Sequence, residues 1–84
     1  MRDAKAVKAV GLLARTFREE AGLTQDALAK ILNVTQAVVS RFENGHCLLS
    51  QDKFRAYMDA CNITGLPRIE ILNSFNQARR YIRG

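Results

Sequence analysis

The sequence predicts an all-α protein, a compact bundle of five helices. Apolar residues recur at intervals of three and four along most of the chain, as they do on one face of a helix. The alternation typical of a β-strand never extends beyond a few residues. The chain has 84 residues, of which 48% are hydrophobic and 25% are charged. This length and composition fit one small globular domain.

The first helix is expected from about residue 3 to residue 20. Asp3 is a suitable N-cap, and Gly22 provides a stop beyond the last turn. A single apolar stripe follows the helical spacing, and its members are Val7, Val10, Leu13, Ala14 and Phe17.

The second and third helices are expected over residues 25–32 and 36–44. Thr24 and Thr35 are their N-caps, and Asn33 suits a left-handed turn between them. Gly45 ends the third helix. The residues expected to be buried are Leu28, Ile31 and Leu32 in the second helix, and Val38, Val39 and Phe42 in the third.

The fourth helix is expected over residues 51–61, with Ser50 as its N-cap. The fifth begins at Pro67, because a first-turn residue needs no N–H, and continues to about residue 82. The apolar stripe of the fourth helix is Phe54, Tyr57, Met58 and Cys61, and that of the fifth is Ile71, Leu72, Phe75, Ala78 and Ile82.

The stretch from Leu23 to Gly45 indicates two short helices joined by a tight turn. Ala29 in the first and Val39 in the second allow the two helices to cross closely at a steep angle. Such a unit makes the second helix protrude, and a protruding helix fits the major groove of B-DNA. The net charge of +5 also favours a polyanionic partner, nucleic acid first and an anionic membrane second.

This stretch resembles the lambda-repressor-like helix-turn-helix domains of the Cro/cI or XRE type. Several motifs occur in the family's order and spacing, and they are GLTQ at 22–25, LA at 28–29, NVTQ at 33–36 and SRFENG at 40–45. With the preceding LARTFREEAG helix, the resemblance covers roughly residues 7–62, and residues 66–82 match only as the family's usual fifth helix. Residues 1–84 are therefore expected to form a single domain of this kind.

The resemblance implies a base-reading face on the third helix. Gln36 corresponds to the family's adenine-reading Gln, and Ala37, Ser40 and Arg41 complete the face. Two plain alternatives stay open, because Gln36 could be a solvated first-turn residue and Arg41 could hold a phosphate or a neighbouring acid. The residues that correspond to phosphate contacts are Gln25, Thr35 and Asn44.

Arg18 and Glu43 resemble the family's internal ion pair, which ties the first helix to the end of the third. Removal of one partner would strand the other charge and is expected to cost about 3–5 kcal/mol. Arg18 is therefore expected to be structural and not to read DNA.

One recognition helix reads only about four or five base pairs, so a two-fold dimer on an inverted repeat is expected. The expected dimer surface is the stripe on the fifth helix. The alternatives are that the whole stripe covers the monomer's own core, or that different faces serve each role. The residues of the stripe are Ile71, Leu72, Phe75, Ala78 and Ile82. Leu48 and Leu49 are expected either to pack under the fourth helix or to join an interface.

The expected function is sequence-specific binding of double-stranded DNA by a homodimeric repressor or autoregulator, which occludes a promoter from its operator. Small proteins of this kind resemble phage repressors, restriction–modification controllers and antitoxins of mobile elements. The alternative is an antitoxin or adaptor that chiefly binds a partner protein, and an antirepressor partner also stays open. An enzyme is not expected, because no catalytic triad, carboxylate cluster or phosphate loop occurs. His46 beside Cys47 is the only nucleophile–base pair, and it is not expected to form a catalytic dyad.

Neither a metal nor another cofactor is expected. His46, Cys47 and Cys61 supply three soft ligands at most, without a zinc spacing. The two cysteines are expected to be thiols in a reducing cytoplasm. No apolar run reaches 18 residues, so we expect no membrane span and a cytoplasmic protein, associated with the nucleoid when it is on DNA.

Overall fold

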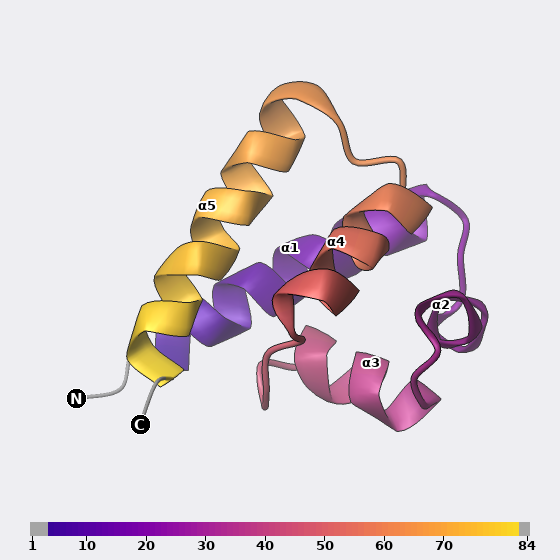
Figure 1. Cartoon of the computed structure of the whole chain (residues 1–84), viewed down its shortest axis with the longest axis horizontal. Helices are drawn as coiled ribbons and strands as arrows, with labels where there is room; N and C mark the ends of the chain where they lie inside the picture. Colours follow the sequence, from indigo (N-terminus) through magenta and orange to yellow (C-terminus); the bar gives the residue numbers. More distant parts are fainter. Residues whose placement is uncertain (1–3, 83–84) are drawn as a thin grey trace.

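The computed structural model describes residues 4–82 of the chain, and within them the backbone forms five α-helices and no strand (Figure 1). The helices are α1 (Ala4–Glu20), α2 (Gln25–Leu32), α3 (Gln36–Glu43), α4 (Gln51–Ala60) and α5 (Gly65–Ile82). Helix α1 packs against both α5 and α3, while α2 packs against α3 and α4. The prediction of an all-α fold of five helices is confirmed.

Helix boundaries follow the predicted capping residues closely. The side-chain oxygens of Thr24, Thr35 and Ser50 accept hydrogen bonds from the third backbone N–H of their helices, at 3.0, 3.3 and 3.2 Å. These bonds satisfy donors that a helix leaves unpaired at its first turn. Asn44 and Cys61 are C-caps and lie just outside α3 and α4, whereas the predicted N-cap Asp3 lies outside the described residues.

Helix α5 begins at Gly65, two residues before the predicted start at Pro67. Pro67 still occupies the first turn, where a missing N–H costs no helical hydrogen bond. Gly65 has φ +64°, a left-handed conformation that glycine adopts without a Cβ clash. The connection between α4 and α5 thus contains two left-handed residues, Asn62 with φ 55° and Gly65. Helix α5 is longer than the proline alone indicates.

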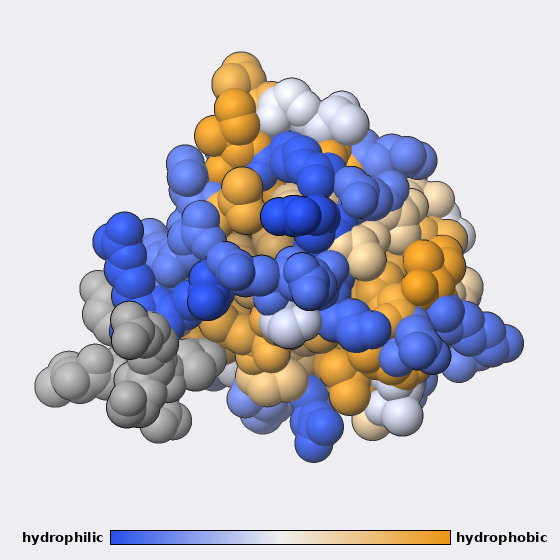
Figure 2. All heavy atoms as spheres, in the orientation of Figure 1, coloured by the Kyte–Doolittle hydropathy of each residue, from blue (hydrophilic) through white to orange (hydrophobic). Residues whose placement is uncertain are grey.

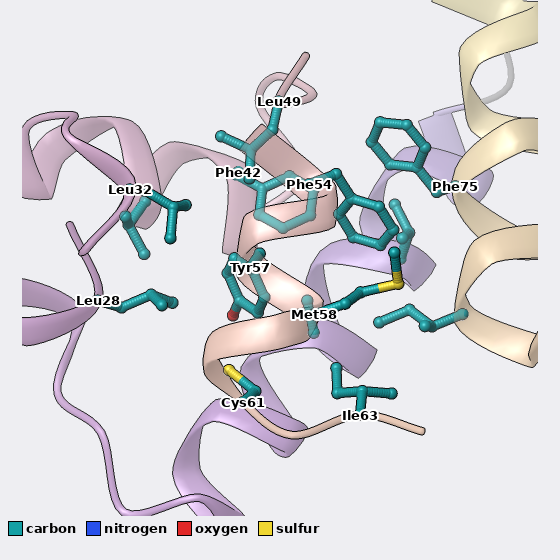
Figure 3. Packing of buried hydrophobic residues seen from close by; sticks show 14 of the residues in the cluster. Leu28, Leu32, Phe42, Leu49, Phe54, Tyr57, Met58, Cys61, Ile63 and Phe75 are labelled. Carbon is teal, nitrogen blue, oxygen red and sulfur yellow. The ribbon is translucent and has the colours of Figure 1, made fainter. Parts of the chain in front are cut away.

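Aromatic rings from three helices form the centre of the core (Figure 3). Phe54 of α4 stacks on Phe75 of α5, with ring centroids 4.0 Å apart and planes 4° apart. Phe42 of α3 meets Tyr57 of α4 edge to face at 5.5 Å. Such pairs favour α3, α4 and α5 in one relative position, beyond the stabilisation from buried area.

Three members of the apolar stripe of α5 cover the monomer's own core, which corrects the prediction that Ile71, Phe75 and Ala78 form a dimer surface. Ile71, Phe75 and Ala78 are at most 1% exposed, because α5 lies against α1 and the aromatic rings of α4. Leu72 alone among the four described members remains 38% exposed, and the side chain of Ile82 lies outside the described residues.

The structure also corrects the prediction for Ile31 and decides between the two alternatives for Leu48 and Leu49. Ile31 was expected inside, but it is 57% exposed, since the short helix α2 buries Leu28, Ala29 and Leu32 instead. Leu49 is buried and Leu48 packs partly against the core. The loop between α3 and α4 therefore uses Leu49 for packing and does not present it to a partner.

Gly11 allows α1 to cross the end of α3 at close range. A Cβ at this position would lie 2.4 Å from the carbonyl oxygen of Phe42 and 2.8 Å from that of Glu43. Both neighbours are backbone atoms, so no side-chain rotation could relieve the overlap. Gly11 therefore sets the distance between α1 and the helix that carries the candidate site.

Candidate nucleic-acid interface

Helices α2 and α3 are joined by three residues in a fixed turn. Asn33 adopts φ 58°, and its N–H donates to the Lys30 carbonyl at 3.2 Å. Val34 donates to the Ala29 carbonyl at 3.0 Å and packs partly against the core. Thr35 then caps α3. The turn is thus held by backbone bonds and by an apolar anchor, which fixes the direction of α3 relative to α2.

Helix α3 separates into a buried and an outward face. Val39, Phe42 and Glu43 are buried against the other helices. The outward face carries the predicted base-reading and phosphate-binding residues of this helix. It consists of exposed Gln36, Ala37, Arg41 and the C-cap Asn44, with Ser40 half-buried among them. The structure therefore brings these five positions together on one accessible surface.

Behind this face lies the predicted ion pair, which the structure contains. Arg18 Nε donates to Glu43 Oε2 at 2.7 Å, and Arg18 Nη2 donates to Glu43 Oε1 at 3.0 Å. The side chains are 8% and 0% exposed. Arg18 Nη1 also donates to the Leu23 carbonyl at 2.7 Å. The pair therefore connects α1, the approach to α2 and the end of α3.

Glu43 accepts two further hydrogen bonds, so that both oxygens of its carboxylate are fully hydrogen-bonded. Tyr57 donates its hydroxyl to Oε2 at 2.6 Å, and Gln25 donates Nε2 to Oε1 at 2.9 Å. Each carboxylate oxygen thus receives two donors. A buried charge with every lone pair occupied avoids the penalty of an unsatisfied polar group.

These contacts set the ionisation of the cluster. Burial by itself raises the pKa of Glu43, but hydrogen bonds from Arg18, Tyr57 and Gln25 outweigh it and hold the pKa below the ordinary value of 4.5. The hydrogen bond to Glu43 raises the pKa of Arg18 despite the opposing effect of burial. Burial and the bond to Glu43 raise the pKa of Tyr57, so its hydroxyl stays a donor.

The hydrogen bonds continue from the buried cluster to the surface. Gln36 Nε2 donates to Gln25 Oε1 at 2.6 Å, while Gln25 itself donates to Glu43. Gln36 is the first residue of α3 and is exposed. The side chain predicted to read adenine is therefore tied through Gln25 to the core.

The remaining predicted phosphate contacts lie at opposite ends of α3. Thr35 precedes the helix and accepts a bond from Val38 N–H, which leaves its hydroxyl hydrogen able to donate to another group. Asn44 follows the helix, and its Nδ2 lies 3.3 Å from Ser40 Oγ. Both residues are exposed.

Arg41 has no acidic partner in the described part of the chain. Ion pairs there join Arg15 to Glu19, Arg18 to Glu43, Lys30 to Asp26, and Arg68 to Asp59. The alternative of a surface ion pair at Arg41 therefore finds no support within residues 4–82. Its exposed guanidinium can donate to a base or to a phosphate.

Three residues that shape the site were not predicted to do so. The sequence predicts Tyr57 only as a member of an apolar stripe, and it indicates no role for Gly11. Lys53 of α4 donates from Nζ to the Leu32 carbonyl at 2.7 Å. This cation pairs with a carbonyl that has no helical partner at the C-terminal end of α2. Two sequence signals could have indicated the roles of Tyr57 and Gly11. A tyrosine in an apolar stripe needs a partner for its hydroxyl, and a glycine inside a helix often marks close packing.

The described residues include His, Cys, Asp and Glu side chains that could bind a metal or act as nucleophiles. No group of three or more potential metal ligands occurs among them. Cys47 and Cys61 are free thiols, and burial raises the pKa of Cys61 to about 11, which keeps it protonated and unreactive. None of the helices described is long and apolar enough to span a bilayer.

Comparison with known proteins agrees with this geometry. Residues 9–70 match the family model of the helix-turn-helix domain. The fold is similar to the crystal structure of the clp gene regulator ClgR from C. glutamicum, with a TM-score of 0.70 and 22% sequence identity over 87% of this chain and 90% of that one. No curated protein matches the sequence. Since the family model spans most of the chain, and the sequence motifs resemble those of lambda-repressor-like domains, the protein belongs to the helix-turn-helix family.

Proposed function

We propose that this protein is a sequence-specific DNA-binding regulator of transcription that reads the major groove with the outward face of α3. The observation that carries the proposal is the chain of hydrogen bonds from Glu43 through Gln25 to Gln36. It presents an amide in one orientation at the exposed start of a helix. A solvated glutamine needs no such support, whereas a base-reading one benefits from it.

Gln36 has the donors and acceptor that adenine requires. Its Nε2 carries two hydrogens, of which one bonds Gln25. The second can donate to adenine N7 while Oε1 accepts from N6, the paired contact typical of glutamine. Ala37 offers only a methyl group and suits a thymine methyl, while Arg41 suits guanine O6 and N7.

Phosphate contacts would hold α3 in the groove from both ends. Gln25 retains one amide hydrogen beyond its bond to Glu43. Together with the Thr35 hydroxyl it lies at the start of α3, where backbone N–H groups also favour an anion. Asn44 lies at the far end. Contacts on both sides of the base-reading face would fix its register on the duplex.

We propose further that the protein binds as a homodimer on an inverted repeat and acts as a repressor by occlusion. A single α3 covers too few base pairs to address a genome. The exposed apolar side chains of α5, Leu66, Ile69 and Leu72, are 74%, 55% and 38% exposed and recur at every third position. Hydrophobic side chains project where α5 begins (Figure 2). This surface could meet its own copy across a two-fold axis.

The test is selection of bound duplexes from a random pool, followed by affinity measurements over a range of salt concentrations. Specific binding predicts an inverted repeat with half-site centres about 34 Å apart and a steep fall of affinity with salt. Weak binding without a motif would contradict the proposal. It would instead favour the alternative role of an adaptor that binds a protein through the exposed face of α5.

A further inference from the structure

Tyr57 is a core residue that carries one polar group, its hydroxyl. Filling the core requires only the ring and not the hydroxyl. Its ring is fully buried and contacts Phe42 edge to face (Figure 3). A phenylalanine would fill the same space. The hydroxyl differs, because it donates to Glu43 Oε2 at 2.6 Å, the shortest of the four bonds that this carboxylate accepts.

The hydroxyl helps to fix how the carboxylate lies. Oε2 receives Tyr57 and Arg18 Nε, and Oε1 receives Arg18 Nη2 and Gln25. Without Tyr57, only the guanidinium would hold Oε2, and the carboxylate could tilt in the plane of that fork. Such a tilt would move Oε1, which is the anchor for Gln25.

The position of Gln25 in turn determines how Gln36 presents its amide. A carboxylate only accepts hydrogen bonds, so Gln25 must direct its NH₂ group to Glu43 and its oxygen away. That oxygen accepts from Gln36, which must therefore turn its own NH₂ toward Gln25. Oε1 of Gln36 is then left for the DNA. The amide orientation at the surface thus follows from the carboxylate in the core.

We propose that Tyr57 is a positioning residue for base recognition, which acts through Glu43 and Gln25 to hold the Gln36 amide in its reading orientation. The inference rests on the proposed function, because it assigns Tyr57 to the same site. Tyr57 itself is fully buried, so this role requires no direct contact with DNA.

A two-by-two set of variants tests it. Four proteins are compared: the unmodified chain, Tyr57→Phe, Gln36→Ala and the double variant. Each is titrated with the selected duplex and with a duplex in which the adenine read by Gln36 is replaced by another base. The ratio of the two affinities is the readout. We expect a ratio of about 5- to 150-fold for the unmodified chain and a loss of about 2- to 10-fold of that ratio in Tyr57→Phe. In the Gln36→Ala background, Tyr57→Phe should change nothing further.

A merely structural role gives a different result. Loss of folded protein lowers affinity for both duplexes equally and leaves their ratio unchanged. The variants are therefore compared at a temperature where each is folded by circular dichroism. Phe54→Leu is the matched control, because Phe54 also stacks with Tyr57 but has no hydrogen bond to Glu43. It should lower stability and keep the ratio.

The outcomes separate the two proposals. If the unmodified chain discriminates and Gln36→Ala does not, but Tyr57→Phe retains the full ratio, the role of Tyr57 is overturned and the function stands. An equal loss of ratio in Phe54→Leu, or a further loss in the double variant, also overturns it. Absence of discrimination in the unmodified chain overturns both the role of Tyr57 and the proposed function.

Side-chain amide NMR of the free protein adds a second readout. In Tyr57→Phe, the amide signals of Gln36 should move toward those of a solvated glutamine.

Discussion

Arg18 on α1 and Glu43 at the end of α3 form a buried ion pair with two hydrogen bonds, although 25 residues separate them in the sequence. The pair joins the first helix to the recognition helix. Because both charges are desolvated, either one alone would be left without compensation.

Replacement of one partner should therefore destabilise the fold strongly. We expect Arg18→Ala to lower the free energy of unfolding by about 3–5 kcal/mol, measured by urea denaturation. Arg15→Ala is the control, because Arg15 pairs with Glu19 on the surface of the same helix, with side chains 49% and 54% exposed. Its loss should cost about 0–1 kcal/mol. Equal midpoints for the two variants would contradict the structural role of Arg18.

The same pair predicts how stability depends on pH. The pKa of Glu43 is lower in the folded chain than its ordinary value of 4.5, so the unfolded chain takes up the proton first as pH falls. The stabilisation from the ionised carboxylate is complete above pH 4.5 and is lost as pH falls through the folded pKa. The difference in unfolding free energy between the unmodified chain and Glu43→Gln should therefore shrink below pH 4.5. A difference that stays constant with pH would show that folding does not lower the pKa of Glu43, and that its ionised form is no more stabilising than its protonated form.

Gly11 predicts an effect opposite to that of helix propensity. In an open helix, Gly→Ala stabilises by about 1 kcal/mol. Here the added Cβ would meet the carbonyl oxygens of Phe42 and Glu43 at 2.4 and 2.8 Å. Gly11→Ala should instead lower the free energy of unfolding by about 1–3 kcal/mol and weaken DNA binding, since α3 must shift. A raised melting temperature would show that α1 and α3 do not cross so closely.

Helix α5 offers a test that separates core from interface. Phe75 is buried and stacks on Phe54, so Phe75→Ala should cost about 3–5 kcal/mol of stability. Ile69 is 55% exposed. Ile69→Asp should leave the monomer's fold intact by circular dichroism but weaken self-association in sedimentation, and with it binding to an inverted repeat. If Ile69→Asp sediments as the same dimer as the unmodified chain, the interface lies elsewhere.

Local features of this fold could be predicted from the sequence because their causes are local. Thr24, Thr35 and Ser50 cap helices through bonds to residues three positions away. Asn33 takes a left-handed conformation that depends chiefly on its own side chain. The outward face of α3 follows in the same way from helical periodicity.

Features that depend on distant partners could not be predicted in this way. An apolar stripe such as that around Phe75 does not say whether it covers its own core or a second copy. Gly11 has a helical backbone, and its role appears only when the end of α3 is placed against it. The hydroxyl partner of Tyr57 lies 14 residues away in another helix. The short helix α2 likewise turns Ile31 outward for reasons set by its neighbours.

Selection from a random duplex pool, with Gln36→Ala beside the unmodified chain, is the sharpest test of whether Gln36 reads an adenine. Lys30→Ala is the matched control, since Lys30 is an exposed residue of α2 whose ion pair with Asp26 is at the surface. We predict an inverted repeat that relaxes at one position per half-site in Gln36→Ala only, with a loss of about 1–3 kcal/mol per contact. An unchanged motif in Gln36→Ala would show that Gln36 does not read a base.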